Sequence, residues 1–285
     1  MKGLRASDRI LAVLAGLATA GLLTFVLLPV VAIFLRVSPQ TLVTQMHSPA
    51  AVDALVVSLR TSLTALAAIL VVGTPVAYVL SRTTSRWGVI ITTLLELPLV
   101  LPPAVAGIAL LVAFGRFGLL GGTLRLFGIE IPFTAAAVVI AQVFVAMPFY
   151  VRQALASFAA VDEHLLSASR TLGAGPGRTF ALVALPLAGP GLSAGAALAW
   201  ARALGEFGAT ILFAGSLQGV TQTLPLAIYA QFQTGSIAVP LAMSALLVIV
   251  SGAILVTVKL LIRGRLDSAF PAETSTPGVS AVGAA

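Results

Sequence analysis

Long uncharged stretches separate short polar segments along most of the chain. Residues 10–35, 61–81, 131–151, 179–201 and 207–258 contain no Asp, Glu, Lys or Arg. An α-helix needs about 20 apolar residues to cross a hydrocarbon layer of about 30 Å, so each of these runs is long enough to span a membrane. Transmembrane β-strands would instead give alternating segments of about ten residues, which the sequence lacks. The pattern therefore predicts an all-α integral membrane protein.

We predict six transmembrane helices, because a further uncharged run follows Glu96 and polar residues divide the last long run. The expected spans are about residues 10–35, 56–81, 89–114, 131–151, 181–212 and 238–262. The first span exceeds the apolar core of a signal peptide, about 7–15 residues, so we expect it to be retained. Residues 1–265 then form a transmembrane domain, and residues 266–285, rich in Pro, Gly, Ser, Thr and Ala, form a flexible tail.

The Lys and Arg residues are divided unevenly between the two ends of the predicted spans. Arg36, Arg116 and Arg125 lie at one end, and Arg60 and Arg202 lie near or inside helices. The other end carries Lys2, Arg5, Arg9, Arg82, Arg86, Arg152, Arg170, Arg178, Lys259, Arg263 and Arg265. Because short loops rich in Lys and Arg stay in the cytoplasm, we expect both termini there, in a multi-pass protein of the inner cell membrane surrounded by lipid.

Composition excludes several classes of function. Hydrophobic residues make up 59% of the chain and charged residues 9%, against about 25% charged residues in soluble domains. The chain has no cysteine, and His47 and His164 lack the spacing of metal ligands, so we expect no metal, no cofactor and no catalytic residues. The net charge of +7 is scattered between apolar runs, which does not indicate nucleic-acid binding.

The longest polar loop, at about residues 152–180, contains a short amphipathic pattern. Asp162 and Glu163 suit the start of a helix, Leu165, Leu166, Ser169 and Leu172 lie on or near one face, and Gly173 suits the end. The following GAGPGRT lacks the lysine and the preceding strand of a phosphate-binding loop, so we do not expect this chain to hydrolyse ATP. Periodicity alone leaves open whether the helix caps the bundle or docks a partner.

The loop resembles the cytoplasmic signature of ABC importer permeases. That signature has a Glu-Ala-Ala triplet, a glycine and a hydrophobic-x-Leu-Pro ending at fixed spacing. The matching residues, which the resemblance identifies as the coupling site for an ATPase subunit, are Ser167, Ala168, Ser169, Gly173, Leu185 and Pro186. Ser167 stands where the family has glutamate, which puts an ionic role at this position in doubt.

Other segments resemble the molybdate permeases within this family. These are ARALGEFGATILFAG at 201–215, TQTLPLAIY at 221–229, LPLVLPPAVAGIALL at 97–111 and FGRFGLLG at 114–121, the last two also resembling sulfate permeases. The resemblance covers about residues 55–262 and implies the type I ABC importer architecture, six spans with a cytoplasmic coupling helix.

The resemblance also implies a function and a set of partners. It suggests a non-catalytic permease subunit that forms the translocation path for molybdate as a homodimer. Two ATP-binding subunits would hydrolyse ATP below it, and a periplasmic molybdate-binding protein would deliver the anion. Tungstate, or sulfate and thiosulfate, are alternative substrates. A stand-alone secondary anion transporter is an alternative of another class, but the inverted repeats and midplane ionisable sites common in such proteins are not evident.

A charged pair in the fifth predicted span is a candidate gate or path element. Arg202 and Glu206 are four residues apart, so on one helix they would share a face and could form an ion pair. Charges within the membrane usually face the bundle interior or a water-filled path. The pair would therefore either fix the helix or line a gate.

Glycines and prolines nearby complete this group of candidates. Gly205 and Gly208 flank Glu206, where glycine either permits close helix packing or lets the span bend. Pro102 and Pro103 interrupt the third predicted span. They would produce either a kinked packing helix or a bent helix beside the translocation path.

The uneven distribution of Lys and Arg gives a prediction about topology. In this cysteine-free chain, cysteines introduced at Ser7, Ser85 and Ser268 should react with an impermeant thiol reagent only after the membrane is opened. Cysteines at Ser48 and Ser216 should react in cells whose inner membrane is intact. Labelling of Ser85→Cys under that second condition would contradict the six-span topology.

Overall fold

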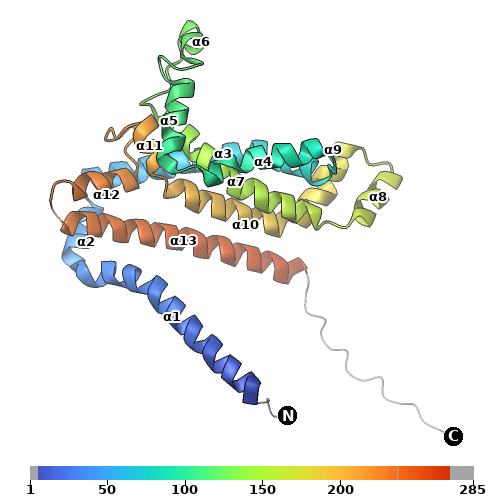
Figure 1. Cartoon of the computed structure of the whole chain (residues 1–285), viewed down its shortest axis with the longest axis horizontal. Coiled ribbons are helices and arrows are strands. Elements are labelled where there is room, and N and C mark those ends of the chain that lie inside the picture. The colour runs from blue at the N-terminus through green and yellow to red at the C-terminus, as the bar shows by residue number, and fades with distance from the viewer. Residues whose placement is uncertain (1–5, 236, 270–285) are drawn as a thin grey trace. The chain divides into compact units, whose positions relative to one another are not determined.

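The structure, a computed structural model, describes residues 6–235 and 237–269, and this part of the chain is helical without any β-strand (Figure 1). The all-α prediction is confirmed. In chain order the helices are α1 (Ala6–Arg36), α2 (Pro39–Met46), α3 (Pro49–Ser81), α4 (Arg86–Val100), α5 (Pro103–Phe114), α6 (Gly121–Leu126), α7 (Ala135–Ala159), α8 (Glu163–Thr171), α9 (Pro176–Thr179), the π-helix η1 (Phe180–Ala184), α10 (Leu185–Leu204), α11 (Gly208–Phe213), α12 (Leu224–Phe232) and α13 (Ala238–Ala269). Of the tail predicted over residues 266–285, residues 266–269 continue α13 and the rest lies outside the described residues.

Five helical segments among the described residues are long and apolar enough to cross a membrane. They are Ile10–Arg36, Pro49–Ser81, Ala135–Ala159, Pro176–Leu204 and Ala238–Thr257. A sixth crossing requires α4 and α5 to count together, and these two helices are bent by 114° at the break between them. Proline explains the break: Pro102 and Pro103 have no N–H to donate, and a residue that precedes proline is disfavoured in helical geometry. The third predicted span is therefore a bent pair of helices.

The fifth predicted span, 181–212, also differs from the observed helices. It begins with η1, and α10 ends at Leu204. Residues 205–207 are not helical, and the short α11 follows from Gly208. The prediction of one helix through residue 212 is wrong because the glycines on both sides of Glu206 weaken the helix at this point.

The chain divides into two compact units, and several helices contribute to both. One unit comprises Met1–Ala65, Leu101–Val145 and Ala203–Gly252, and the other Leu66–Val100, Ala146–Arg202 and Ala253–Ala285. The first unit has two buried apolar clusters. One joins α5, α7 and α11 through residues such as Leu110, Val138 and Phe213. The other joins the first half of α3 to α12 and α13 through Ala54, Leu224 and Met243.

Close backbone contact fixes α11 against α5 in the first unit, where the two helices lie side by side (Figure 1). A Cβ atom at Gly107 would lie 2.7 Å from the carbonyl oxygen of Ala209, and one at Gly208 would lie 2.7 Å from Cβ of Pro103. Small residues let helix backbones approach in this way in membrane proteins. Gly107 and Gly208 are therefore positions where the backbones of α5 and α11 pack closely.

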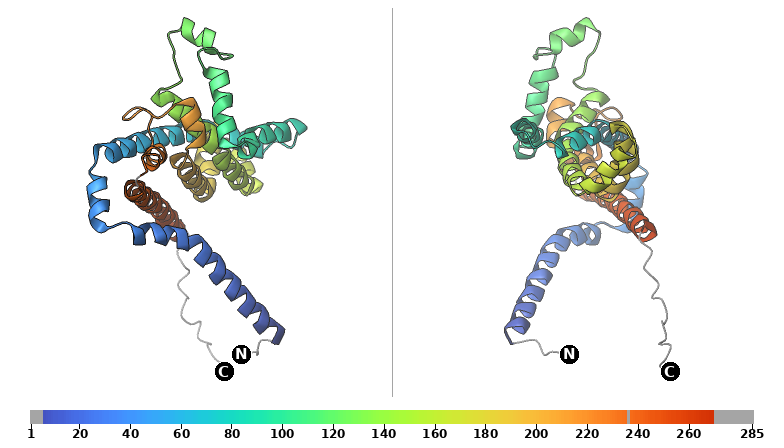
Figure 2. Two further views of the ribbon diagram at one scale, coloured as in Figure 1. Left: turned by 60° about the vertical axis from the view of Figure 1, so that its left-hand side comes forward. Right: turned by 90° about the vertical axis from the view of Figure 1, so that its right-hand side faces the viewer.

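In the second unit the second halves of α3 and α7 pack closely with α10, and Figure 2 (right) views this bundle nearly along its helices. The Thr74 and Tyr150 hydroxyl oxygens lie 2.6 Å apart. Cβ atoms at Gly73 and Gly195 would lie 3.0 Å from Cδ1 of Tyr150 and Cβ of Gln153. These contacts hold the three helices at short separations and position the loop that leaves α7.

Apolar side chains also cover much of the outside. None of the spanning window of α1 is buried, and its exposed side chains include Leu11, Leu17 and Phe25. Exposed apolar area of this extent is unusual for a protein in water and marks a surface that a membrane or another protein covers. The surface agrees with the sequence prediction of a chain that lies in lipid.

Candidate functional site

The loop after α7 contains the short helix that the sequence predicts. The Asp162 side chain caps α8 by accepting a hydrogen bond from the His164 N–H at 2.8 Å. Glu163 lies in the first turn and Arg170 in the last, where acids and bases respectively favour the helix dipole. The predicted start of this helix is confirmed.

Gly173 ends α8 in the left-handed region, with φ +86°. The Gly173 N–H donates to the Arg170 carbonyl at 2.9 Å, and the Ala174 N–H donates to the Ser169 carbonyl at 3.1 Å. This pair of bonds is the Schellman motif, which satisfies the last carbonyls of a helix and favours glycine at that position. The prediction that Gly173 ends the helix is confirmed, and the residue does so in a backbone conformation that other residues rarely adopt.

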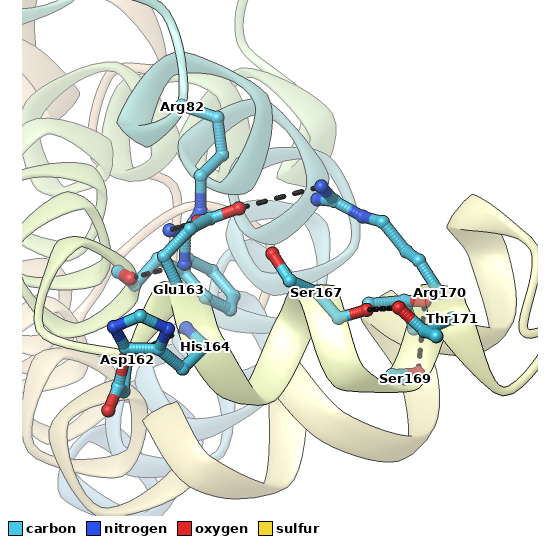
Figure 3. Close-up of polar contacts among 10 residues, drawn as sticks. Arg82, Asp162, Glu163, His164, Ser167, Ser169, Arg170 and Thr171 are labelled. Carbon is cyan, nitrogen blue, oxygen red and sulfur yellow. Dashed lines mark hydrogen bonds and ion pairs between the residues drawn. The ribbon is translucent and has the colours of Figure 1, made fainter.

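An ion cluster fixes the start of α8 to the end of α3 (Figure 3). The Glu163 carboxylate lies between two guanidinium groups, with Oε2 at 2.8 Å from Nη1 of Arg82 and Oε1 at 3.5 Å from Nη1 of Arg170. Nη2 of Arg82 donates to the Phe158 carbonyl of α7 at 2.8 Å. Sequence reasoning missed Arg82 because it precedes Glu163 by 81 residues and no local pattern links them.

An aromatic cluster lies at the same corner of the second unit. The Tyr78 ring is 5.3 Å from that of Phe158 and 4.8 Å from that of Phe180, centroid to centroid. The Arg82 guanidinium lies 5.9 Å from the Tyr78 ring centre, within the range of a cation–π contact. The side chains of Phe158 and Leu166 are fully buried. The ion cluster and these rings together attach the loop to α3, α7 and η1.

A shallow groove of about 660 Å³ lies between α8 and the start of the next membrane span. Its lining is apolar except for Ser169 and Arg178. The lining residues are Leu165, Ala168, Ser169, Leu172, Ala174, Arg178, Leu182, Val183, Pro186 and Leu187. Leu165 and Leu172 are exposed while Leu166 is buried, so the leucines predicted to share one face are divided between the groove and the core.

The predicted coupling residues therefore converge in part. Ala168, Ser169 and Pro186 line the groove. Ser169 also lies 3.2 Å from the Thr179 hydroxyl oxygen, which connects α8 to α9. Ser167 is exposed on α8 outside the groove, and Leu185 is half-buried. Gly173 acts through the backbone at the end of α8.

The predicted gate residues have a different arrangement from the one expected. Glu206 lies beyond the end of α10 and is 1% exposed, so the single helix expected to carry both Arg202 and Glu206 ends between them. Its Oε1 accepts a hydrogen bond from the Ala209 N–H at 2.8 Å and so satisfies a donor in the first turn of α11. The buried carboxylate thus accepts a backbone N–H that has no helical partner because the span is interrupted.

The other predicted gate residues lie near the break between α10 and α11 or near the break between α4 and α5. Pro103 and Gly208 are in contact, Pro102 precedes the first turn of α5, and Arg202 lies in the last turn of α10. Gly205 lines a separate apolar cavity of about 450 Å³ with Phe207, Tyr229 and residues of α13. The structure thus brings together Pro103 and Gly208 but does not assign a transport role to either.

The sequence model of one protein family, described as the inner membrane component of binding-protein-dependent transport systems, matches residues 69–267. This chain belongs to that family. The match includes α8, the groove and Arg82.

Transport permeases of several bacteria are similar to this chain over 64–90% of its length. The molybdenum transport system permease protein ModB of Mycobacterium tuberculosis is 46% identical over 243 residues, which cover 85% of this chain and 90% of that protein. The probable transport system permease protein NifC of Clostridium pasteurianum is 37% identical over 257 residues, 90% of each chain. ModB of Escherichia coli K12 is 42% identical over 183 residues, 64% of this chain and 80% of that protein.

Solved structures of ABC importers share the fold. A bacterial alginate ABC transporter, bound to its periplasmic protein with an alginate pentasaccharide, matches with a TM-score of 0.72 and 14% identity over 91% of this chain and 96% of that chain. The inward-facing MetNI methionine transporter matches with a TM-score of 0.60 and 21% identity over 75% and 95%. The predicted ABC importer permease fold is confirmed, and the chain is a multi-pass inner membrane protein.

The Schellman motif of this permease gives a prediction about α8. In Gly173→Ala the new side chain would occupy the left-handed region, which costs about 1–2 kcal/mol, so the last turn of α8 should open more often. Amide hydrogen exchange at residues 170–174 should then be roughly 5–30 times faster. Gly175→Ala is the matched control, because Gly175 has φ −68° and no atom within 4 Å of an added Cβ. Equal exchange in the two variants would contradict the role assigned to Gly173.

Proposed function

We propose that this chain is the permease subunit of an ATP-driven ABC importer and forms the membrane path for molybdate. The observation that carries the proposal is the 46% identity to a molybdenum transport permease, which extends over 90% of that protein. The ABC importer fold of the structural neighbours supports the same function. Two copies of the chain would face each other around the path.

A separate ATPase subunit would bind at α8, which we call the coupling helix. The groove beside it is apolar, shallow and open, and leucine side chains at its edge are exposed. Such a surface gains free energy when another protein covers it. Ser169, Arg178 and the exposed Ser167 would make the polar contacts with the ATPase. Because position 167 is serine here and not the glutamate of the family signature, the ATPase would not need a cation opposite it. In this arrangement the coupling helix and both termini face the cytoplasm.

The burial of Glu206 suits a path for an anion. A carboxylate exposed to the path would repel an oxyanion, whereas Glu206 is almost fully buried and accepts a backbone hydrogen bond. Selection of the anion would depend mainly on a periplasmic binding protein. The solved alginate transporter, which has the same fold, is bound to such a protein. The path itself would need only small residues, hydroxyls and backbone N–H groups, because tight binding there would slow release.

Movement of the two coupling helices would drive the transport cycle. ATP-driven closure of the two ATPase subunits would draw the coupling helices together and open the path outward. ATP hydrolysis would return the permease to the inward-facing state. The chain itself would supply the path and the mechanical connection but no hydrolytic chemistry.

Uptake of labelled molybdate tests the proposed function. The chain, its ATPase and its binding protein should restore uptake in a bacterium that lacks its own high-affinity molybdate importer. An ATPase variant that binds but does not hydrolyse ATP should abolish that uptake. A tenfold excess of sulfate should leave uptake nearly unchanged, while tungstate, a close chemical analogue, should compete.

Three results would overturn parts of the proposal. Uptake without the ATPase would indicate a secondary transporter. Uptake of sulfate in preference to molybdate would replace the substrate and keep the ABC mechanism. No uptake of either anion by an assembled complex would contradict both.

A further inference from the structure

A residue that directly follows a third helix, α3, bridges the corner between α7 and α8. α7 ends at Ala159 and α8 begins at Glu163, so the chain turns within residues 160–162. Arg82 follows directly after α3 and reaches both sides of this turn (Figure 3). One nitrogen binds the Phe158 carbonyl and another binds the Glu163 carboxylate, each at 2.8 Å.

Electrostatics favours an arginine at this position. The last carbonyls of a helix carry partial negative charge. The Phe158 carbonyl, in the last turn of α7, accepts the Val161 N–H at 3.1 Å and has a second lone pair for a further donor. Glu163 adds a full negative charge in the first turn of α8. The planar guanidinium holds two donors in a fixed fork, so Arg82 can satisfy both acceptors at once. A lysine would bring a single ammonium group to the same place.

Of the two ion pairs of Glu163, whose side chain is 57% exposed, the one with Arg82 is shorter and involves the less exposed guanidinium. The Arg82 side chain is 23% exposed and packs against Tyr78, whereas the Arg170 side chain is 52% exposed and lies farther from the carboxylate. Exposed pairs contribute little because water and salt screen them. The shorter contact, made by the less exposed guanidinium of Arg82, is therefore the stronger restraint on the start of α8.

The helix that ends directly before Arg82, α3, is itself attached to α7. The hydroxyl contact between Thr74 and Tyr150, and the close approach of Gly73 to the Tyr150 ring, hold the second half of α3 against α7. The Tyr78 and Phe158 rings add a further contact near the corner. A displacement of α8 must therefore either move these two helices with it or break the contacts of Arg82.

We propose that Arg82 is a positioning residue that fixes the coupling helix on α3 and α7, so that force applied to α8 moves both membrane helices together. This inference rests on the proposed function. The coupling signature contains neither partner of this ion pair. Arg82 lies far from the loop in sequence, and Glu163 lies one helical turn before Ser167. Glu163 is the acidic residue of α8, and its carboxylate faces Arg82 within the chain.

The test compares coupling in variants of the reconstituted complex of permease, ATPase and binding protein. The quantity measured is the number of ATP molecules hydrolysed for each molybdate taken up. Arg82→Gln should raise this ratio roughly two- to fivefold, the scale expected when an ion pair with an exposed carboxylate is lost. Arg82→Lys should give an intermediate ratio, because lysine keeps the charge but cannot bind both acceptors. The double variant Arg82→Gln/Glu163→Gln should be no worse than Arg82→Gln alone.

Arg86→Gln is the matched control, since it removes the same charge from an exposed residue a few positions away that is in neither ion pair of Glu163. A ratio that is unchanged in Arg82→Gln, or changed equally in Arg86→Gln, would overturn the inference. If Arg82→Gln does not accumulate in the membrane, Glu163→Gln decides the question, because it removes the same ion pair and keeps the bond to Phe158. A normal ratio in Glu163→Gln would then contradict the inference.

Failure of the proposed substrate is distinguishable from failure of this inference. A wild-type complex that hydrolyses ATP but takes up no molybdate would reject the substrate. In that case amide hydrogen exchange of α8 still tests the attachment. Faster exchange across residues 163–171 in Arg82→Gln but not in Arg86→Gln would support it, and equal exchange would reject it.

Discussion

Backbone N–H and C=O groups that lie in hydrocarbon must find partners within the protein, and this requirement governs the structure from the spans to the loops. It explains why the described chain is helical and why its helices are long. It also makes each interruption of a span a problem that neighbouring residues must solve. At residues 205–207 the Glu206 carboxylate accepts the Ala209 N–H of α11, and near Pro102 fewer donors need partners because Pro102 and Pro103 have no N–H.

Helix ends also need hydrogen-bond partners where the chain passes from α7 to α8. There the Asp162 cap, the Schellman motif at Gly173 and the bond from Arg82 to Phe158 satisfy the ends of successive helices. These bonds also join successive elements of the loop, so they fix its conformation at the end of the helix bundle. A rigid projection is what a partner subunit needs if its movement is to reach the membrane helices.

Sequence reasoning succeeded where the signal was local. Apolar run length predicted the spans, and the spacing of Asp162, Glu163 and Gly173 predicted α8 with its start and its end. It failed where two effects competed within one run. The apolar character of 181–212 favoured one helix, but the glycines beside Glu206 and the contact of Gly208 with Pro103 favoured a break. Neither contact across the fold, Arg82 with Glu163 or Gly107 with Ala209, leaves any local trace in the sequence.

The central claim is that α8 is the contact through which an ATPase subunit acts on this permease. Because the chain has no cysteine, a photoreactive thiol probe can be attached at a single site, Ala168→Cys, in the assembled transporter. The account predicts a covalent adduct with the co-expressed ATPase subunit from this site and none from Gly122→Cys on α6. The absence of an ATPase adduct from position 168, in a complex that still imports molybdate, would contradict it.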